Sequence, residues 1–350
     1  MWVAEGERWE EGGFRRGWVA VEAGRIVDAG RGAAPRAADA RGVLMPSLVN
    51  AHTHVADRLA RGRIPEGISL AAAVEPPHGL KYRLLREAGE EALRASIRAA
   101  CSEARAAGTR VLYDFREGGV AGTRALREGA AGTGVEPVVL AAPAHGEMPA
   151  PGEAEALLAL ADGFGLSAVR DVTPSFAREH AARARAAGAR FAVHWSEGVH
   201  EPLDHALDLA PDFLVHAVQA TPDDVARIAE ARVPIVTCPR SNLRLVRALP
   251  DLRAWLDAGI DVCIGSDNAM LQTVSVLDEL RFARERLPDV RPEELVAMAV
   301  DAPRRRLAPP GAMRAWEPGE PADLVVLEGS GDPWSVVFGG APRVVHPPAA

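Results

Sequence analysis

The 350-residue sequence has almost no lysine, since Lys81 is the only one among its 40 basic residues. This arginine bias is typical of a GC-rich genome, with heat adaptation as the alternative. The three cysteines are too few and too scattered for a disulfide framework or a CxxC zinc motif, so a reducing, cytoplasmic compartment is expected.

Long apolar runs are also missing. No run approaches the ~20 residues that a membrane helix needs, and the acidic N-terminal segment lacks the apolar core of a secretory signal. We therefore expect no membrane partner. The formal net charge of −8 argues against nucleic acid as a partner.

The middle of the chain contains eight short runs rich in Val, Ile and Leu. They are nearly continuous in apolar residues, which is typical of strands buried on both faces. The runs are 43–50, 109–115, 136–142, 164–170, 189–195, 212–218, 233–238 and 260–266. Segments with helical periodicity separate them, most clearly 83–107, 154–160, 175–187 and 222–231.

This alternation predicts an α/β fold, a (β/α)₈ TIM barrel over residues 46–308. An open, doubly wound sheet is the structural rival, but it would carry a glycine-rich phosphate loop after its first strand. Both chain ends are strand-like, in segments 18–23, 26–28, 321–327, 336–338 and 342–345. We expect residues 1–45 and 309–350 to form a small composite β-sandwich.

Histidines and an aspartate follow four of the predicted barrel strands. His52 and His54 end the first, and on an extended strand they point the same way. His194, His216 and Asp267 end the fifth, sixth and eighth. Because barrel active sites lie at the carboxyl ends of the strands, these side chains should meet. Imidazoles with one carboxylate suit Zn²⁺, with Fe²⁺ or Mn²⁺ as alternatives.

This order of residues resembles the amidohydrolase superfamily: His-x-His, then His-x-x-Glu, a strand-end His and Ser-Asp. Three segments resemble its mononuclear cytosine deaminase and atrazine or triazine hydrolase branch. They are 46–54, where Ser47 stands in place of the usual Gly, the Cys-Pro-x-Ser-Asn loop at 237–243, and the Ala-Asp-Leu-Val strand at 322–325.

The resemblance also implies a metal count. Binuclear members bridge two metals with a carboxylated lysine from the fourth strand, and 164–170 contains no lysine. The resemblance therefore implies a single divalent metal ion, with zinc as the first candidate. The implied ligands are His52, His54, His194 and Asp267, with His216 beside the metal.

The implied reaction is hydrolysis by a metal-activated hydroxide. Asp267 would take the proton of the water, Glu197 would protonate a ring nitrogen of the substrate, and His216 would hold the attacking oxygen. The leading interpretation is an aminohydrolase that deaminates a purine-, pyrimidine- or pterin-like heterocycle. The alternatives are loss of chloride or an alkylamine, opening of a cyclic amide, and a metal-free scaffold. Family habit implies a dimer or higher oligomer.

Substrate contacts are expected from polar residues in the loops above the barrel. The long segment 55–80 is a candidate lid. Lys81 follows it directly and either has a specific role or is a chance residue on a solvated helix start. Five other histidines, His78, His180, His200, His205 and His346, are predicted at the surface. The candidate substrate-binding residues are Lys81, Arg116, Glu117, His145, Arg170 and Asn242.

Overall fold

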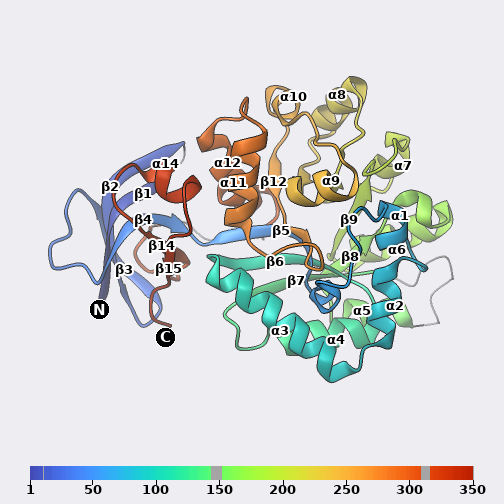
Figure 1. The fold of residues 1–350 in the computed structure, drawn as a ribbon, viewed down its shortest axis with the longest axis horizontal. Coiled ribbons are helices and arrows are strands. Elements are labelled where there is room, and N and C mark those ends of the chain that lie inside the picture. Colours follow the sequence, from blue (N-terminus) through green and yellow to red (C-terminus); the bar gives the residue numbers. More distant parts are fainter. Residues whose placement is uncertain (11, 143–151, 309–315, 350) are drawn as a thin grey trace.

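The computed structural model describes residues 1–10, 12–142, 152–308 and 316–349. Its strands form two sheets, one of six strands and one of nine (Figure 1). Both chain ends lie in the smaller sheet, and most helices surround the larger one. No helix of the described residues is long and apolar enough to cross a membrane.

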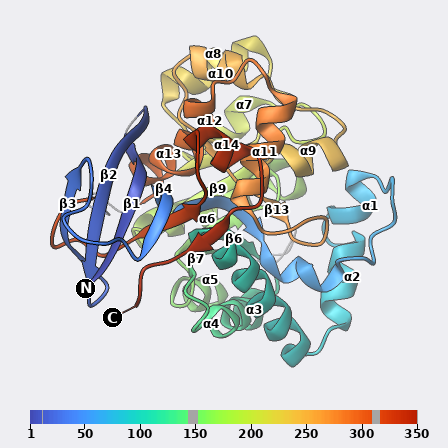
Figure 2. The ribbon, with the colours of Figure 1, turned by 60° about the vertical axis from the view of Figure 1, so that its left-hand side comes forward.

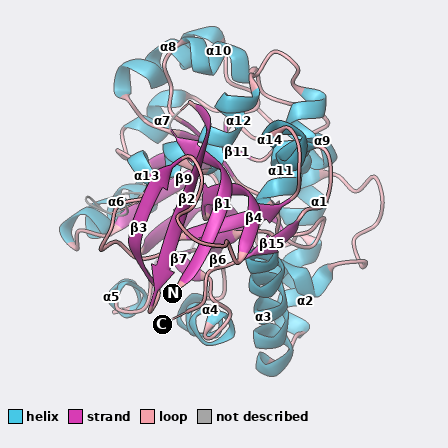
Figure 3. Ribbon diagram, turned by 90° about the vertical axis from the view of Figure 1, so that its left-hand side faces the viewer, coloured by secondary structure: helices cyan, strands magenta, loops and turns pink. Residues whose placement is uncertain are grey.

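The smaller sheet combines strands from both ends of the chain, in the order β15-β14-β4-β1-β2-β3 (Figure 3). Only the β1–β4 pair is parallel. Side chains of alternate residues along its strands pack on opposite faces of the sheet. Leu44 and Val326 belong to the sheet's own apolar cluster, whereas Val43, Met45 and Leu327 join the barrel core. Its strands are β1 (Trp2–Glu10), β2 (Gly13–Glu22), β3 (Arg25–Arg31), β4 (Ala40–Pro46), β14 (Leu324–Glu328) and β15 (Arg343–Val345).

The larger sheet is parallel throughout and follows chain order from β5 to β12. Its strands are β5 (Leu48–His54), β6 (Thr109–Arg116), β7 (Glu136–Ala141), β8 (Gly163–Leu166), β9 (Arg190–Trp195), β10 (Phe213–His216), β11 (Ile235–Thr237), β12 (Val262–Ile264) and β13 (Asp267–Asn268). The surrounding helices are η1 (Val55–Ala60), α1 (Leu70–Val74), α2 (Leu80–Glu87), α3 (Glu90–Ala106), α4 (Gly119–Ala130), α5 (Glu153–Leu158), η2 (Val169–Asp171), α6 (Pro174–Ala186), α7 (Leu203–Leu207), α8 (Pro222–Ala231), α9 (Pro239–Leu245), α10 (Leu252–Asp257), α11 (Val276–Arg286), α12 (Pro292–Ala299), α13 (Asp301–Arg306) and α14 (Pro333–Phe338). The predicted fold class, an α/β barrel with a small β domain from both termini, is confirmed, although the described part of that domain holds a single six-stranded sheet rather than the two sheets of the predicted sandwich.

The eighth barrel strand consists of two short segments, β12 and β13. Together they close the barrel, because each pairs with a different neighbouring strand. β12 pairs with β11 on one side, and β13 pairs with β5 on the other. Between them, Asn50 on β5 exchanges two hydrogen bonds with Ser266, each of 2.8–2.9 Å. Gly265 is required here because a Cβ would lie 2.6 Å from the backbone nitrogen of His52. This junction, where β12 and β13 meet β5, is called the seam. It brings Asp267 beside the histidines of β5.

The predicted strand run 164–170 is shorter in the structure, because β8 ends at Leu166 and η2 begins at Val169, and three other predicted elements differ more strongly. The run 43–50 is divided between the two sheets, because the chain passes from β4 to β5 at Ser47 (Figures 1 and 2). The helix predicted over 83–107 breaks at Ala88 and Gly89, both extended, and restarts with the acidic first turn of α3. Residues 336–338 belong to helix α14 rather than to a strand, because the Asp332 side chain caps the helix through Ser335 N–H.

Candidate active site

The β5 histidines converge on one carboxylate oxygen. His52 Nε2 lies 3.3 Å and His54 Nε2 lies 3.6 Å from Asp267 Oδ1. The three residues come from the two strands that meet at the seam. Ser241 donates a hydrogen bond to the other oxygen, Oδ2, while Oδ1 has no hydrogen-bond partner although it is fully buried. Asp267 therefore presents one free oxygen to the two imidazoles.

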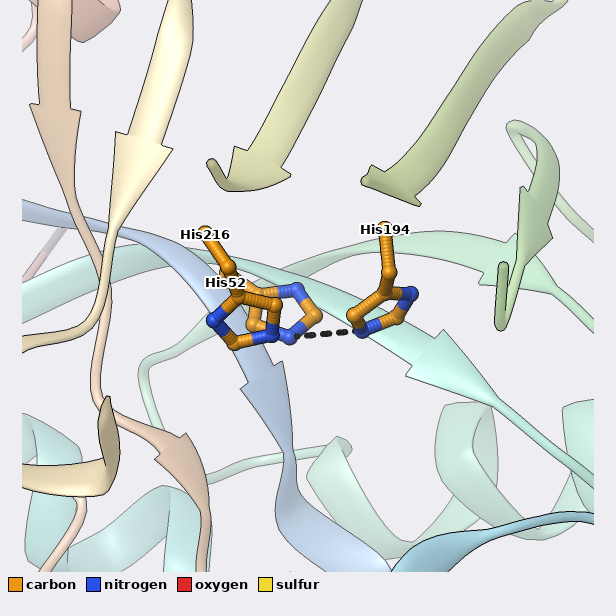
Figure 4. A group of neighbouring side chains, drawn as sticks. All are labelled: His52, His194 and His216. Carbon is orange, nitrogen blue, oxygen red and sulfur yellow. Dashed lines mark hydrogen bonds between the residues drawn. The ribbon is translucent and has the colours of Figure 1, made fainter. Parts of the chain in front are cut away.

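Two further histidines complete the cluster from β9 and β10. His194 Nε2 lies 3.2 Å from His52 Nε2, and the His216 ring centroid lies 5.2 Å from that of His194 (Figure 4). Backbone φ is +75° at His216 and +55° at Asp267. Positive φ is rare for residues other than glycine and clusters at functional sites. The structure thus brings together the four predicted ligand residues and His216.

Backbone carbonyls orient two of the imidazoles. His54 Nδ1 lies 3.0 Å from Phe115 O, and His194 Nδ1 lies 2.7 Å from Leu166 O. A carbonyl only accepts hydrogen bonds, so each ring carries its proton on Nδ1 and presents the Nε2 lone pair to the cluster. Outer hydrogen bonds of this kind are usual for metal-binding histidines.

These donor atoms fit a divalent metal. Imidazole lone pairs facing one another in a buried space need a cation between them, and the partnerless Oδ1 of Asp267 adds a negative charge. The ligand atoms of His52, His54 and Asp267 all lie within 4.8 Å of one another. Imidazole nitrogens with a carboxylate oxygen form a donor set that suits a divalent metal ion.

Burial keeps most of the cluster neutral. It lowers the pKa of His52 to about 3 and that of His216 to about 4, and it holds the pKa of His194 well below its usual value. His54 differs: burial and Lys81 lower its pKa, but Glu117 and Asp57 outweigh them and raise it. Burial raises the pKa of Asp267, yet the surrounding imidazoles of His52, His216 and His54 outweigh it and hold the pKa well below its usual range.

Glu197 is the acid that lies beside His216 at this cluster. Its Oε1 lies 3.7 Å from His216 Nε2, and the side chain lines the cavity that opens onto the histidines. Burial, with a further contribution from the Asp267 carboxylate, raises the pKa of Glu197 to about 8. The two nearby carboxyl groups thus differ in protonation state at neutral pH: Asp267 is ionised and Glu197 is protonated. Such a divergence is typical of acid and base partners in catalysis.

The cavity has a volume of about 500 Å³. Part of its wall comes from residues 69–76, which include α1 and belong to the candidate lid segment. Arg170 also lines the cavity, between Asp171 at 3.7 Å and Glu201 at 3.5 Å. His145, another predicted substrate contact, lies outside the described residues.

Lys81 is buried rather than solvated, with 2% of its surface exposed. Its Nζ lies 2.5 Å from Glu117 Oε1, 3.2 Å from Asp57 Oδ2 and 3.5 Å from His54 Nδ1. Burial lowers the pKa of Lys81, but the two carboxylates outweigh it and hold the pKa well above its usual value. Lys81 thus contacts His54 on the side away from the cluster. The predicted alternative, a chance residue on a solvated helix start, is wrong.

Neighbouring predicted residues have similar supporting positions. Glu117 lies 3.1 Å from His54 Nδ1 and 3.3 Å from Arg116, so it connects Lys81 to the histidine. Both Lys81 and Glu117 also line the cavity. Asn242 is fully buried and contacts His216 rather than the cavity. His180 is buried too, against Phe164 and Phe176, so its predicted surface position is wrong.

Two supporting residues were missed in the sequence. Asp57 follows His54 by three residues, and its full burial beside Lys81 has no signal in composition. Ser241, which holds Asp267, lies within the Cys-Pro-x-Ser-Asn segment. In the sequence this segment indicated the family and the candidate Asn242, and the 26 residues between Ser241 and Asp267 gave no signal of their contact.

Replacing Lys81 by methionine is expected to lower the free energy of unfolding by about 3–5 kcal/mol. The change leaves the carboxylates of Asp57 and Glu117 buried without their cation. Urea unfolding measures the difference. As a control, Arg94→Met breaks exposed ion pairs with Glu90 and Glu128 and should cost no more than about 1 kcal/mol. Equal losses in both variants would contradict this interpretation of Lys81.

Comparisons with known proteins identify the family of the chain. The model of the amidohydrolase family matches residues 43–346. A putative aminohydrolase of Archaeoglobus fulgidus is 34% identical over 249 residues, covering 69% of this chain and 68% of that protein. A 5-methylthioadenosine/S-adenosylhomocysteine deaminase of Halobacterium salinarum is 30% identical over 296 residues, covering 75% and 67%.

Among solved structures, a zinc-bound adenosine deaminase from Xanthomonas campestris superposes with a TM-score of 0.83. It is 20% identical to this chain, and the match covers 97% of this chain and 89% of that one. This likeness concerns the fold. Because the family model spans both the barrel and strands of the terminal sheet, the chain belongs to the amidohydrolase family, as its motifs predicted, and is a hydrolase.

Proposed function

We propose that this chain is a mononuclear, zinc-dependent aminohydrolase that deaminates a purine-, pyrimidine- or pterin-like heterocycle. His52, His54, His194 and Asp267 would hold the metal. The observation that carries the proposal is the placing of the Glu197 carboxyl beside this donor set, where it lines the cavity. We further propose that the barrel domain covers 46–308, with 1–45 and 309–350 as the terminal domain.

A single metal is supported by the position of Lys81. The fourth barrel strand and its flanks, 164–170, contain no lysine. Lys81 contacts the outer nitrogen of His54, on the side away from the converging Nε2 atoms. It is therefore poorly placed to bridge two ions. When bound, zinc lowers the pKa of water from 15.7 to about 7 and so supplies hydroxide at neutral pH.

Glu197 would act as the proton donor. Its carboxyl holds a proton at neutral pH and faces the cavity, so it can protonate a ring nitrogen of the heterocycle. Protonation draws electrons from the adjacent carbon and makes it open to attack by water. The ionised Asp267 can accept the proton that water loses, through the oxygen that Ser241 does not occupy.

His216 would bind the oxygen that becomes charged during attack. It is buried and neutral, and its Nε2 faces Glu197 across the cavity floor. A neutral imidazole that donates a hydrogen bond stabilises such an oxygen most strongly where water is excluded. Ammonia then leaves from the same carbon. The deaminase and aminohydrolase relatives support this leaving group over chloride or an alkylamine.

An ammonia-release screen tests the proposal directly. The zinc-loaded protein is incubated with adenosine, 5-methylthioadenosine, S-adenosylhomocysteine, cytosine, guanine, a pterin, a chlorotriazine and a cyclic amide, and ammonia, chloride and substrate consumption are all measured. We expect ammonia from at least one amino-heterocycle, with the matching shift in its ultraviolet spectrum. Chloride release alone would replace the proposal with a chlorohydrolase. Consumption of a cyclic amide without ammonia would indicate ring opening.

A further inference from the structure

The first turn of α9 contacts two residues of the cavity floor. Ser241 donates a hydrogen bond to Asp267 Oδ2, and the side-chain amide of the next residue, Asn242, lies 2.9 Å from His216 Nδ1. Both side chains are fully buried. Pro239 occupies the first position of the helix and has no N–H to satisfy, which favours the start of α9 here. This one turn therefore touches the proposed base and the proposed oxygen-binding histidine.

The orientation of the Asn242 amide follows from its other contact. The backbone N–H of Cys238 points at the amide oxygen, Oδ1, at 3.3 Å. A backbone N–H only donates, so its partner must be the oxygen rather than the NH₂ group. The NH₂ group consequently faces His216 and donates to Nδ1.

This contact decides which nitrogen of His216 carries the proton. A neutral imidazole has one protonated nitrogen and one with a lone pair. Because Nδ1 accepts from Asn242, the lone pair is on Nδ1 and the proton is on Nε2. His54 and His194 have the opposite arrangement, since their Nδ1 atoms face the carbonyls of Phe115 and Leu166.

Distances alone leave the role of His216 open. The ligand atoms of His52, His194 and His216 also lie within 4.8 Å of one another, so this trio could equally hold a metal (Figure 4). A metal ligand needs a lone pair directed at the ion. The protonated Nε2 of His216 has none, whereas Nε2 of His194 does.

We infer that Asn242 is a positioning residue that holds His216 in the Nε2–H tautomer, keeping it out of the metal ligand set and making it a hydrogen-bond donor to the reacting oxygen. Asn242 was expected to bind substrate, and this assigns it a different task. The inference deepens the proposed function, on which only its kinetic test rests, since the tautomer can be observed without substrate.

Nitrogen-15 spectra of histidine-labelled protein, loaded with zinc, report the tautomer directly. The two ring nitrogens of His216 are identified by their absence in His216→Gln. We expect a protonated Nε2 and an unprotonated Nδ1, the reverse of the pattern at His54 and His194. A proton on Nδ1 of the wild-type His216, with Nε2 bound to metal, would overturn the inference, whatever the substrate proves to be.

Two substitutions at Asn242 separate tautomer from packing. Asn242→Asp keeps the shape and the acceptor for Cys238 N–H, but it offers His216 an acceptor and so places a proton on Nδ1. Asn242→Ala removes the contact and leaves a void. A packing role predicts that Ala harms kcat more than Asp, whereas a tautomer role predicts that Asp is at least as harmful as Ala.

We expect Asn242→Asp to lower kcat by about 10²-fold or more, with KM changed by less than about threefold and the metal content unchanged. The ¹⁵N spectrum of this variant should show Nδ1 of His216 protonated. If Nδ1 stays unprotonated, or if kcat exceeds that of Asn242→Ala, the inference fails. If neither protein releases ammonia from any heterocycle but the spectra show the expected tautomers, the proposed function fails and the inference stands.

Discussion

The His194→Ala variant is expected to purify without its metal and with less than about one-thousandth of the wild-type activity. His194 supplies one of three inward-facing nitrogens, and the carbonyl of Leu166 holds it in place. Removing one of the four proposed ligands would open the coordination shell to exchange. The loss of metal costs several kcal/mol of transition-state stabilisation, which is about 10³-fold or more in rate. Elemental analysis per chain measures the metal, and ammonia release measures the activity.

Two other histidines provide controls for this result. His205 is exposed, and His180 is buried on α6 without any contact to the cluster. Both alanine variants should keep close to one metal per chain, although His180→Ala should lose stability. Full metal content in His194→Ala would move the site elsewhere. Two metals per wild-type chain would reject the mononuclear proposal.

Replacing Glu197 by glutamine is expected to lower kcat by about 10²–10⁴-fold while leaving the metal in place. Glutamine keeps the shape of the side chain but cannot give up a proton. Burial and Asp267 raise the pKa of Glu197 to about 8, so the acid is protonated below that pH and loses its proton above it. Wild-type activity should therefore fall as the pH rises through the pKa of Glu197, which a bound divalent cation would lower. This alkaline limb should be absent from the residual activity of the variant.

The contrast with metal loss makes this test specific. If Glu197→Gln loses its metal, Glu197 is a ligand rather than a proton donor. If the variant keeps both its rate and the alkaline limb, another acid supplies the proton. Glu179→Gln, a change at a partly exposed residue of α6 that pairs with Arg183, should match wild type in rate and pH profile.

The strand-end residues could be predicted because the buried parallel strands that carry them could be identified in the sequence. In a parallel sheet all carboxyl ends lie at one edge, so His52, His194, His216 and Asp267 must gather if their strands are identified. The strands themselves are apolar on both faces, and this is visible in composition. The ends of the chain alternate instead, which indicated a separate sheet.

Other features depend on contacts that sequence spacing does not contain. Lys81 is 27 residues from His54 and 36 from Glu117, and its burial follows from how α2 packs on η1. Asn242 and His216 are 26 residues apart, on different elements. The apolar pattern at 336–338 suits a strand or a short helix equally, and the Asp332–Pro333 start decides for the helix.

The seam of the barrel gives the metal a second consequence. Asp267 lies on one side of the junction and the β5 histidines on the other, more than 200 residues apart along the chain. An ion bound by residues on both sides would connect the first and last strands of the barrel. It would bind the folded chain but not the unfolded chain. Loading and folding are then linked by mass action, with a stabilisation that grows by about 1.4 kcal/mol for each tenfold rise in free metal above the dissociation constant. The durability of the barrel in a cell would then depend on the supply of metal as well as on the sequence.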